Sequence, residues 1–245
     1  MSRLRPNIMS IAGFDPSGGA GTLADCKTFE QLKVYGFAVL TANTVQDDRT
    51  VSQVNWFQLP AILQQIDVIL DRFEVNYFKL GIVKDAEMLQ TVVKHIRSRV
   101  PKAFITWDPV LRSTGGTTFF TDPVVSAEVL SLLDLITPNL PEFCEIFGDG
   151  FDPGQLPAKL MVFLKGGHNT VKLGTDTFYF DRKSFNFRPK AERITPKHGS
   201  GCVLASALTA HLALGFKPHQ AALKSKRYIE QVLNSRPELL GYHKR

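Results

Sequence analysis

Short apolar runs alternate along the chain with amphipathic stretches. An apolar run at residues 8–11 precedes a helix-like segment at 20–34, and a run at 78–80 precedes another such segment at 86–99. In the later segment, apolar residues recur at i, i+3, i+4 and i+7, which places them on one face of a helix. Strands that alternate with helices are typical of crossover units, whose strands run parallel. The pattern therefore predicts an α/β fold with a mainly parallel central sheet.

Three further apolar runs lead into a polar residue. Residues 103–107 precede Asp108, residues 135–137 are followed by Pro138 and Asn139, and residues 160–164 precede Lys165. Taken singly, each polar residue also fits an ordinary role as a turn former or a solvated charge. An open α/β sheet presents its ligand crevice beyond the carboxyl ends of its strands. Together, the three residues predict a ligand site at that edge.

Two stretches have a pattern typical of β-hairpins or flaps. Residues 38–57 contain short β-prone pieces around a turn at 46–49, and residues 177–180 are followed closely by a second β-prone piece at 185–187. We expect flaps or edge strands at both places. The sequence shows no internal repeat and no Pro- or Ser-rich linker, so we expect a single domain over residues 1–245.

The segment 195–202 combines a glycine-rich turn with a cysteine. Gly199 and Gly201 allow a sharp turn, and the apolar run at 203–214 predicts a helix that starts beside it. The N–H groups at a helix start bind phosphate oxygens, and their positive field favours the thiolate of Cys202, which could then accept a proton from a substrate hydroxyl. The alternative is an ordinary turn with Cys202 as a small buried apolar residue.

A second glycine-rich segment, residues 13–21, follows the first apolar run directly. It fits neither the GxxxxGK[ST] pattern of a Walker loop nor the GxGxxG pattern of dinucleotide-binding proteins. Its alternative explanation is a generic turn.

Composition and charge limit the partners that we expect. The 245 residues carry a formal net charge of +6, but Lys and Arg are spread along the chain, which favours small anionic ligands over nucleic acid. Cys26, Cys144 and Cys202 form no CxxC pair, as expected for a protein of the reducing cytoplasm. The apolar run near the N-terminus is too short for a signal peptide or a membrane span, so we expect no membrane association.

At residues 12–46 the chain closely resembles the opening of hydroxymethylpyrimidine/phosphomethylpyrimidine kinases, thiamine-pathway members of the ribokinase-like superfamily. Further motifs follow in that family's order, at residues 79–82, 108–110, 137–142, 164–168 and 198–202. The resemblance implies a three-layer α/β/α sandwich of the ribokinase-like type. It also implies transfer of phosphate from ATP, with Mg²⁺, to 4-amino-5-hydroxymethyl-2-methylpyrimidine, to its monophosphate, or to both.

The same motifs imply roles for individual residues. The residues expected to surround the pyrimidine are Gly13, Asp15, Ala20, Gly21, Asp25, Thr44, Gln46, Ile82 and Val110. Those expected to contact ATP are Asn139, Lys165, Gly167 and His198, and those expected beside magnesium are Asp108 and Glu142. Gly199, Ser200, Gly201 and Cys202 are expected to form an anion hole, with Cys202 as the base where most of the superfamily carries Asp.

The chain departs from the family pattern at residues 143–160, where the family usually has a further full helix. Two other functions stay open at this point. Pyridoxal, another aromatic ring with a hydroxymethyl group, is the substrate of related kinases. A ligand-binding protein that has lost turnover is the alternative from another class. The resemblance leaves a homodimer open as well.

Overall fold

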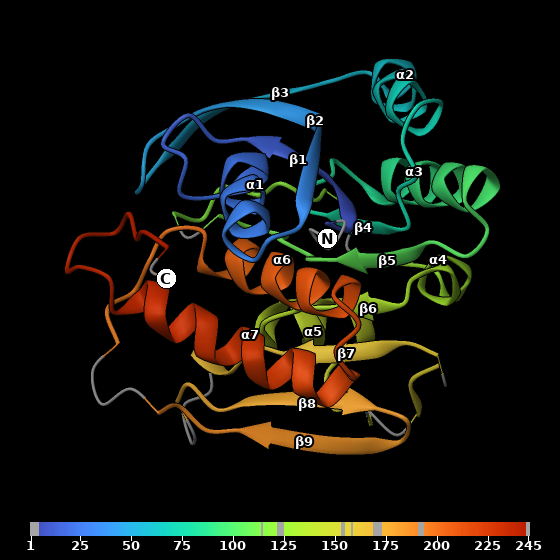
Figure 1. Ribbon diagram of the computed structural model, residues 1–245. Helices are drawn as coiled ribbons and strands as arrows, with labels where there is room; N and C mark the ends of the chain where they lie inside the picture. Colours follow the sequence, from blue (N-terminus) through green and yellow to red (C-terminus); the bar gives the residue numbers. More distant parts are fainter. Residues whose placement is uncertain are drawn as a thin grey trace.

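A nine-stranded sheet runs through the centre of the molecule, in the order β3-β2-β1-β4-β5-β6-β7-β8-β9 (Figure 1). The structure is a computed structural model, and it describes residues 5–113, 115–121, 125–152, 155–157, 159–168, 173–190 and 194–243. The strands are β1 (Asn7–Phe14), β2 (Tyr35–Gln46), β3 (Val51–Trp56), β4 (Tyr77–Leu80), β5 (Phe104–Trp107), β6 (Leu135–Ile136), β7 (Met161–Leu164), β8 (Asp176–Phe180) and β9 (Lys183–Phe187).

The middle of the sheet is parallel and its edges are antiparallel. All the neighbouring pairs from β2 through β7 run parallel. At one edge β3 pairs with β2 as an antiparallel hairpin, and at the other β8 and β9 continue the sheet from β7 in antiparallel fashion. Both predicted hairpins are therefore confirmed. The sequence pattern did not predict that β2 joins the parallel part of the sheet. In the structure, residues 35–40 of β2 pair with β1 in parallel.

Helices cover both faces of the sheet, which confirms the three-layer sandwich (Figure 1). One face packs against α1 (Gly21–Gln31), α6 (Ser200–Ala213) and α7 (Pro218–Leu233), and the other against α2 (Leu59–Leu70), α3 (Ala86–Arg99), α4 (Ala127–Leu132) and α5 (Leu140–Phe147). Each face has its own apolar core, because alternate residues of a strand point to opposite faces. Thus Met9 and Ile11 of β1 belong to the α2–α5 core, while Ile8 packs toward α1.

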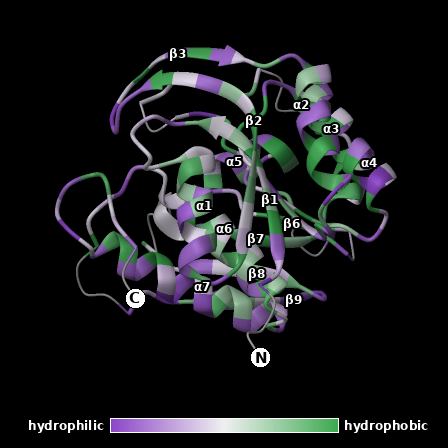
Figure 2. Cartoon of the chain, turned by 45° about the horizontal axis from the view of Figure 1, so that its top comes forward, coloured by the Kyte–Doolittle hydropathy of each residue, from purple (hydrophilic) through white to green (hydrophobic). Residues whose placement is uncertain are grey.

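Helix α3 has the bounds that its periodicity predicts. The Asp85 carboxylate caps it by accepting a hydrogen bond from the N–H of Met88, and Arg97 and Arg99 lie in the last turn, where positive charge is favourable. Its apolar side faces the sheet, and hydrophilic residues lie on its outer side (Figure 2).

Helix α1 ends earlier than the predicted segment 20–34. The N–H of Lys33 donates to the carbonyl of Glu30 and the N–H of Val34 to that of Phe29, and Lys33 has a φ of 64°. This is the Schellman arrangement, which closes a helix by a residue in the left-handed region. It turns the chain directly into β2. Helices α2 and α7 were not identified from the sequence.

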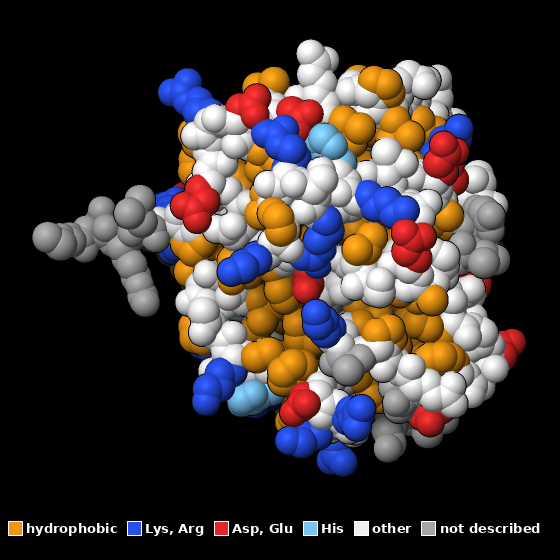
Figure 3. Space-filling model, turned by 90° about the vertical axis from the view of Figure 1, so that its right-hand side faces the viewer, with side chains coloured by type: hydrophobic (Ala, Val, Ile, Leu, Met, Phe, Trp, Pro, Cys, Tyr) orange, Lys and Arg blue, Asp and Glu red, His pale blue; other side chains and the backbone are white. Residues whose placement is uncertain are grey.

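The stretch between α5 and β7 contains no α-helix among its described residues, 148–152, 155–157 and 159–160. Residues 143–147 belong to α5, and the shortening relative to the family stays a prediction. None of the described helices is both long and apolar enough to cross a membrane. On the face drawn in Figure 3, Lys and Arg side chains lie scattered among acidic and apolar ones.

Candidate functional site

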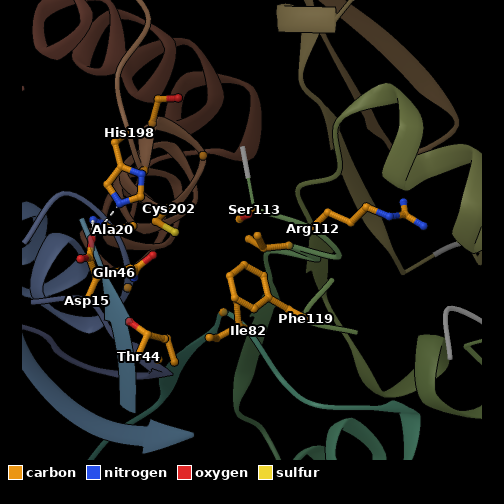
Figure 4. A pocket seen from close by; sticks show the side chains of 18 of the residues that line it. Asp15, Ala20, Thr44, Gln46, Ile82, Arg112, Ser113, Phe119, His198 and Cys202 are labelled. Carbon is orange, nitrogen blue, oxygen red and sulfur yellow. Dashed lines mark hydrogen bonds and ion pairs between the residues drawn. The ribbon is translucent and has the colours of Figure 1, made fainter. Parts of the chain in front are cut away.

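A cleft opens beyond the carboxyl ends of the parallel strands. Its walls come from the loop between β1 and α1, the end of β2, the loops after β4, β5 and β7, and the start of α6 (Figure 4). The predicted site residues that line it are Gly13, Asp15, Ala20, Gly21, Thr44, Gln46, Ile82, Val110, Asn139, Glu142, Lys165, Gly167, His198, Gly199, Ser200, Gly201 and Cys202. The topology thus brings all but two of them, Asp25 and Asp108, to one cavity.

The β1–α1 loop and the end of β2 form one side of the cleft. Asp15, Thr44 and Gln46 lie together there, as Figure 4 shows. The Thr44 hydroxyl donates to the carbonyl of Phe14 at 2.7 Å, which ties β2 to the loop. A Cβ at Gly13 would lie 2.4 Å from Cδ1 of Ile82, so a larger residue at this position would displace the Ile82 side chain. Gln46 and Ile82 therefore line the same part of the cleft as the glycine-rich β1–α1 loop.

The start of α6 forms a second wall. Gly199, with a φ of 70°, adopts a left-handed conformation at the N-cap, and it has no side chain to cap the helix. The N–H of Ser200 donates to the carbonyl of Lys197 at 3.4 Å, which leaves the N–H groups of Gly201 and Cys202 to a ligand, and residues 199–202 all line the cleft. An anion such as a phosphate group fits this position.

The environment of Cys202 differs from the one expected. Its side chain is buried, and burial raises the pKa of the thiol to about 12, although Lys79 and the backbone N–H of Gly21 act in the opposite direction. The thiolate that a helix start was expected to favour is therefore disfavoured at this position. The effect of burial on the pKa of Cys202 outweighs the positive field of the helix start. The neutral thiol lines the cleft beside His198 (Figure 4).

A charged cluster lies at the end of the cleft formed by the loop after β7 and the start of α5. Lys165, directly after β7, donates to Oδ1 of Asp108 at 2.9 Å, and its Nζ lies 3.6 Å from Oε2 of Glu142. Thr137 donates to the same Asp108 oxygen at 2.9 Å. Burial opposes ionisation of Asp108, but Lys165 and Lys79 outweigh it and lower the pKa of the carboxyl group. Burial raises the pKa of Glu142.

Glu142 and Asn139 owe their positions to the start of α5. The Asn139 side chain accepts from the N–H of Glu142 at 2.9 Å, and Glu142 accepts from the N–H of Asn139 at 2.7 Å. This is a capping box, which fixes both side chains at the end of β6. The sequence pattern Asn-Leu-Pro-Glu at residues 139–142 carries this signal.

The two carboxylates fit a magnesium ion in part. Oδ2 of Asp108 is buried and has no hydrogen-bond partner in the described structure, and Glu142 points to the same ammonium group. Among the described residues no three acidic, His or Cys side chains gather as a metal site. Mg²⁺ commonly takes one or two carboxylates and fills its other positions with water and substrate phosphates. Asp108 and Glu142 are thus the residues that would hold it.

Asp25 lies in the core, beneath the cleft, and the expectation that it faces the pyrimidine is not met. Its side chain is fully buried in α1, where it accepts from Ser10 (2.6 Å) and Ser206 (2.6 Å) and pairs with Lys79 at 3.0 Å. Thr28 and Phe29 share the buried side of α1 with it, which points it toward the sheet. The carboxylate joins β1, α1, β4 and α6.

Further lining residues were not predicted. Ala12, Gly81 and Lys197 adjoin motifs that were, but Arg112, Ser113 and Phe119 come from the loop after β5, which has no periodic pattern. Figure 4 places these three across the cleft from Asp15, with Arg112 directed away from Cys202. Arg112 pairs with Glu145 of α5.

Residues 15–244 match the profile of the family described as "Phosphomethylpyrimidine kinase". The hydroxymethylpyrimidine/phosphomethylpyrimidine kinase of Aquifex aeolicus is 34% identical, with 96% of this chain and 97% of that protein covered. The protein of the same name from Rhizobium meliloti is 33% identical, with coverage of 94% and 91%.

Solved structures agree with the fold. The phosphomethylpyrimidine kinase of Clostridium difficile 630 matches with a TM-score of 0.73 and 29% identity, covering 92% of this chain and 98% of that one. The pyridoxal kinase of Staphylococcus aureus, solved with pyridoxal, matches with a TM-score of 0.80 and 24% identity over 98% and 93%. At that identity the second match speaks for the fold alone.

Proposed function

The chain belongs to the phosphomethylpyrimidine kinase family, and on this premise we propose that it transfers the terminal phosphate of ATP to the hydroxymethyl group of 4-amino-5-hydroxymethyl-2-methylpyrimidine, to the monophosphate of that compound, or to both. The family confirms the expected class, a phosphotransferase of thiamine biosynthesis. One observation supports the proposal most: the start of α6, with Cys202, faces Gln46 and Ile82 across one cleft, beside the Lys165 cluster.

The residues of the cleft divide between the two substrates. Gln46, with its amide donor and acceptor, hydrogen-bonds the ring edge and amino group of the pyrimidine, while Ala20 and Ile82 pack against the ring. Asn139, Lys165 and Gly167 lie on the ATP side, whereas His198, which the resemblance also assigned to ATP, contacts Asp15 of the β1–α1 loop. The Lys165 ammonium leaves Asp108 to contact phosphate oxygens when the nucleotide enters. Asp108 and Glu142 would hold Mg²⁺, which would supply further positive charge against the phosphates.

Cys202 acts chiefly by orienting the substrate hydroxyl. Phosphoryl transfer depends mainly on positioning and charge stabilisation, and its transition state is loose, so little proton transfer is needed early. A neutral buried thiol can accept a hydrogen bond from the hydroxyl and hold its oxygen in line with the terminal phosphate. The N–H groups of residues 199–202 stabilise the transferred group, as an anion hole does.

Pyridoxal is the second candidate substrate. It is favoured by one finding, the likeness in fold to pyridoxal kinases. A hundredfold preference between two rings needs only about 2.7 kcal/mol, which a few contacts at Gln46 and Ile82 can supply. A binding protein without turnover is less well supported, because Asp108, Glu142, Lys165 and Cys202 are present and close together.

The test is release of ADP from ATP and Mg²⁺ with the pyrimidine alcohol, its monophosphate and pyridoxal offered separately, and each product identified by mass. We expect turnover of at least one pyrimidine. Turnover of pyridoxal alone would show that the protein is a pyridoxal kinase of vitamin B6 salvage. ATP binding without turnover of any substrate would favour a ligand-binding protein that has lost catalysis. The cytoplasmic location and a homodimer stay predictions.

A further inference from the structure

Asp15 and His198 join two loops that lie far apart in the sequence. Asp15 directly follows β1, and His198 lies just before α6. Nε2 of His198 is 2.8 Å from Oδ2 of Asp15, and the Asp15 side chain is almost completely buried. Figure 4 shows this contact in the wall of the cleft, near Cys202.

The Asp15 carboxylate is fully engaged by protein donors. Oδ1 accepts from the N–H of Ser17 at 2.8 Å, and Oδ2 accepts from the Ser17 hydroxyl at 2.9 Å and the N–H of Ala20 at 2.8 Å, besides His198. Burial would raise the pKa of Asp15, but these hydrogen bonds together lower it. An ionised carboxylate only accepts, so His198 donates from Nε2. Oδ2 thus has three donors and Oδ1 has one, so both carboxylate oxygens are hydrogen-bonded within the protein.

The backbones of the two loops are also in direct contact. A Cβ at Gly199 would lie 2.0 Å from the carbonyl oxygen of Gly19, and a Cβ at Gly19 would lie 2.6 Å from Cδ2 of His198. The N–H of His198 donates to the carbonyl of Leu239 at 2.9 Å, which holds the same loop from behind. The imidazole of His198 therefore packs against the β1–α1 loop, and its hydrogen bond to Asp15 fixes the position of one loop relative to the other.

We infer that Asp15 and His198 form a latch that sets the distance between the pyrimidine-binding loop and the anion hole. On one side the latch holds Ala20, which lines the pyrimidine side of the cleft, and on the other it holds Gly199, where α6 begins. Both are positioning residues that act through the backbone, and His198 is not a nucleotide ligand. The inference rests on the proposed function, because the two loops must hold the hydroxyl and the phosphate in line.

The test compares His198→Gln with His198→Asn. The Gln amide nitrogen reaches the position of Nε2 and can still donate to Asp15, whereas Asn is shorter by one methylene and cannot. A misplacement of about 1 Å can cost on the order of 100-fold in rate. We therefore expect His198→Asn to lower kcat by about 10- to 100-fold, with the separate dissociation constants of ATP and the pyrimidine changed less than about threefold, and His198→Gln to recover most of the turnover.

Two further measurements keep the outcomes distinct. Asp15→Ala combined with His198→Asn should be no slower than the worse single variant, because both break one contact. Melting temperatures show whether each variant is folded. If the Asn variant is not folded, Asp15→Asn, which replaces the carboxylate by an amide of similar size, should show the same loss of kcat at nearly unchanged dissociation constants. Weaker ATP binding by His198→Asn at unchanged kcat would make His198 a direct ligand of ATP and overturn the latch. Losses of kcat that add in the Asp15→Ala, His198→Asn double variant would overturn it as well. Absence of turnover in the unmodified protein would instead contradict the proposed function.

Discussion

Lys79 is a fully buried charge of the described core, and its removal should destabilise the protein strongly. Both partners of its ion pair with Asp25 have no exposed side-chain surface. Lys79→Met keeps the length of the side chain but leaves the Asp25 carboxylate buried with only its two serine donors. Removing one partner of a buried pair costs about 3–5 kcal/mol, because the other charge is left uncompensated.

That loss should be visible in thermal unfolding. For a domain of 150–250 residues, 1 kcal/mol shifts the melting temperature by roughly 2–4 °C, so Lys79→Met should melt roughly 6–20 °C lower. Circular dichroism and urea unfolding measure it. Lys183→Met is the matched control, since Lys183 and Asp181 form an exposed pair whose removal should cost less than about 1 kcal/mol.

A double variant separates the charge from the packing. Lys79→Met with Asp25→Asn removes the stranded carboxylate and keeps an oxygen for the serine hydroxyls, so it should regain part of the lost stability. If Lys79→Met were no less stable than Lys183→Met, the buried pair would not hold β4 and α1 together as described.

Other expectations follow from single side chains. Cys202→Ala should lower turnover far more than ATP affinity, measured by steady-state rates and nucleotide titration; unchanged turnover would remove the thiol from the reaction. Gln46→Ala should weaken pyrimidine binding at nearly constant ATP affinity in calorimetry, and equal losses would make Gln46 structural. Burial lowers the pKa of His211 to about 4 from 6.5, so the unfolded chain binds the proton first and stability should fall by about 3 kcal/mol as the pH drops from about 6.5 to 4. His211→Gln should abolish that loss in urea unfolding at pH 7 and 4.5, and an unchanged acid loss would assign it to other groups.

The fold follows from local patterns to a large extent. Helix α3 has the bounds predicted from its apolar spacing, and the structure adds that the Asp85 cap and a basic last turn end it at the same residues. The strand ends that place Asn139 and Lys165 at the cleft were likewise visible as apolar runs before polar residues. The early end of α1 was missed because Lys33, which is not glycine, takes the left-handed position.

The site was predictable where motifs and strand ends adjoin, and less so where its chemistry depends on distant neighbours. Asp25 lies next to the glycine-rich segment in sequence, but its partners Lys79 and Ser206 come from β4 and α6. The pKa of Cys202 is governed by burial, which no local motif reveals. The contact between Asp15 and His198 spans 183 residues.

The most direct test of the central claim is a single-turnover reaction. Excess protein is mixed with ATP labelled in its terminal phosphate, Mg²⁺ and the pyrimidine alcohol or its monophosphate, and the label is located after quenching. We expect it on the pyrimidine product, at a rate that falls in Cys202→Ala. Label that stays in ATP, or appears only as inorganic phosphate, would contradict phosphoryl transfer to a pyrimidine in this cleft.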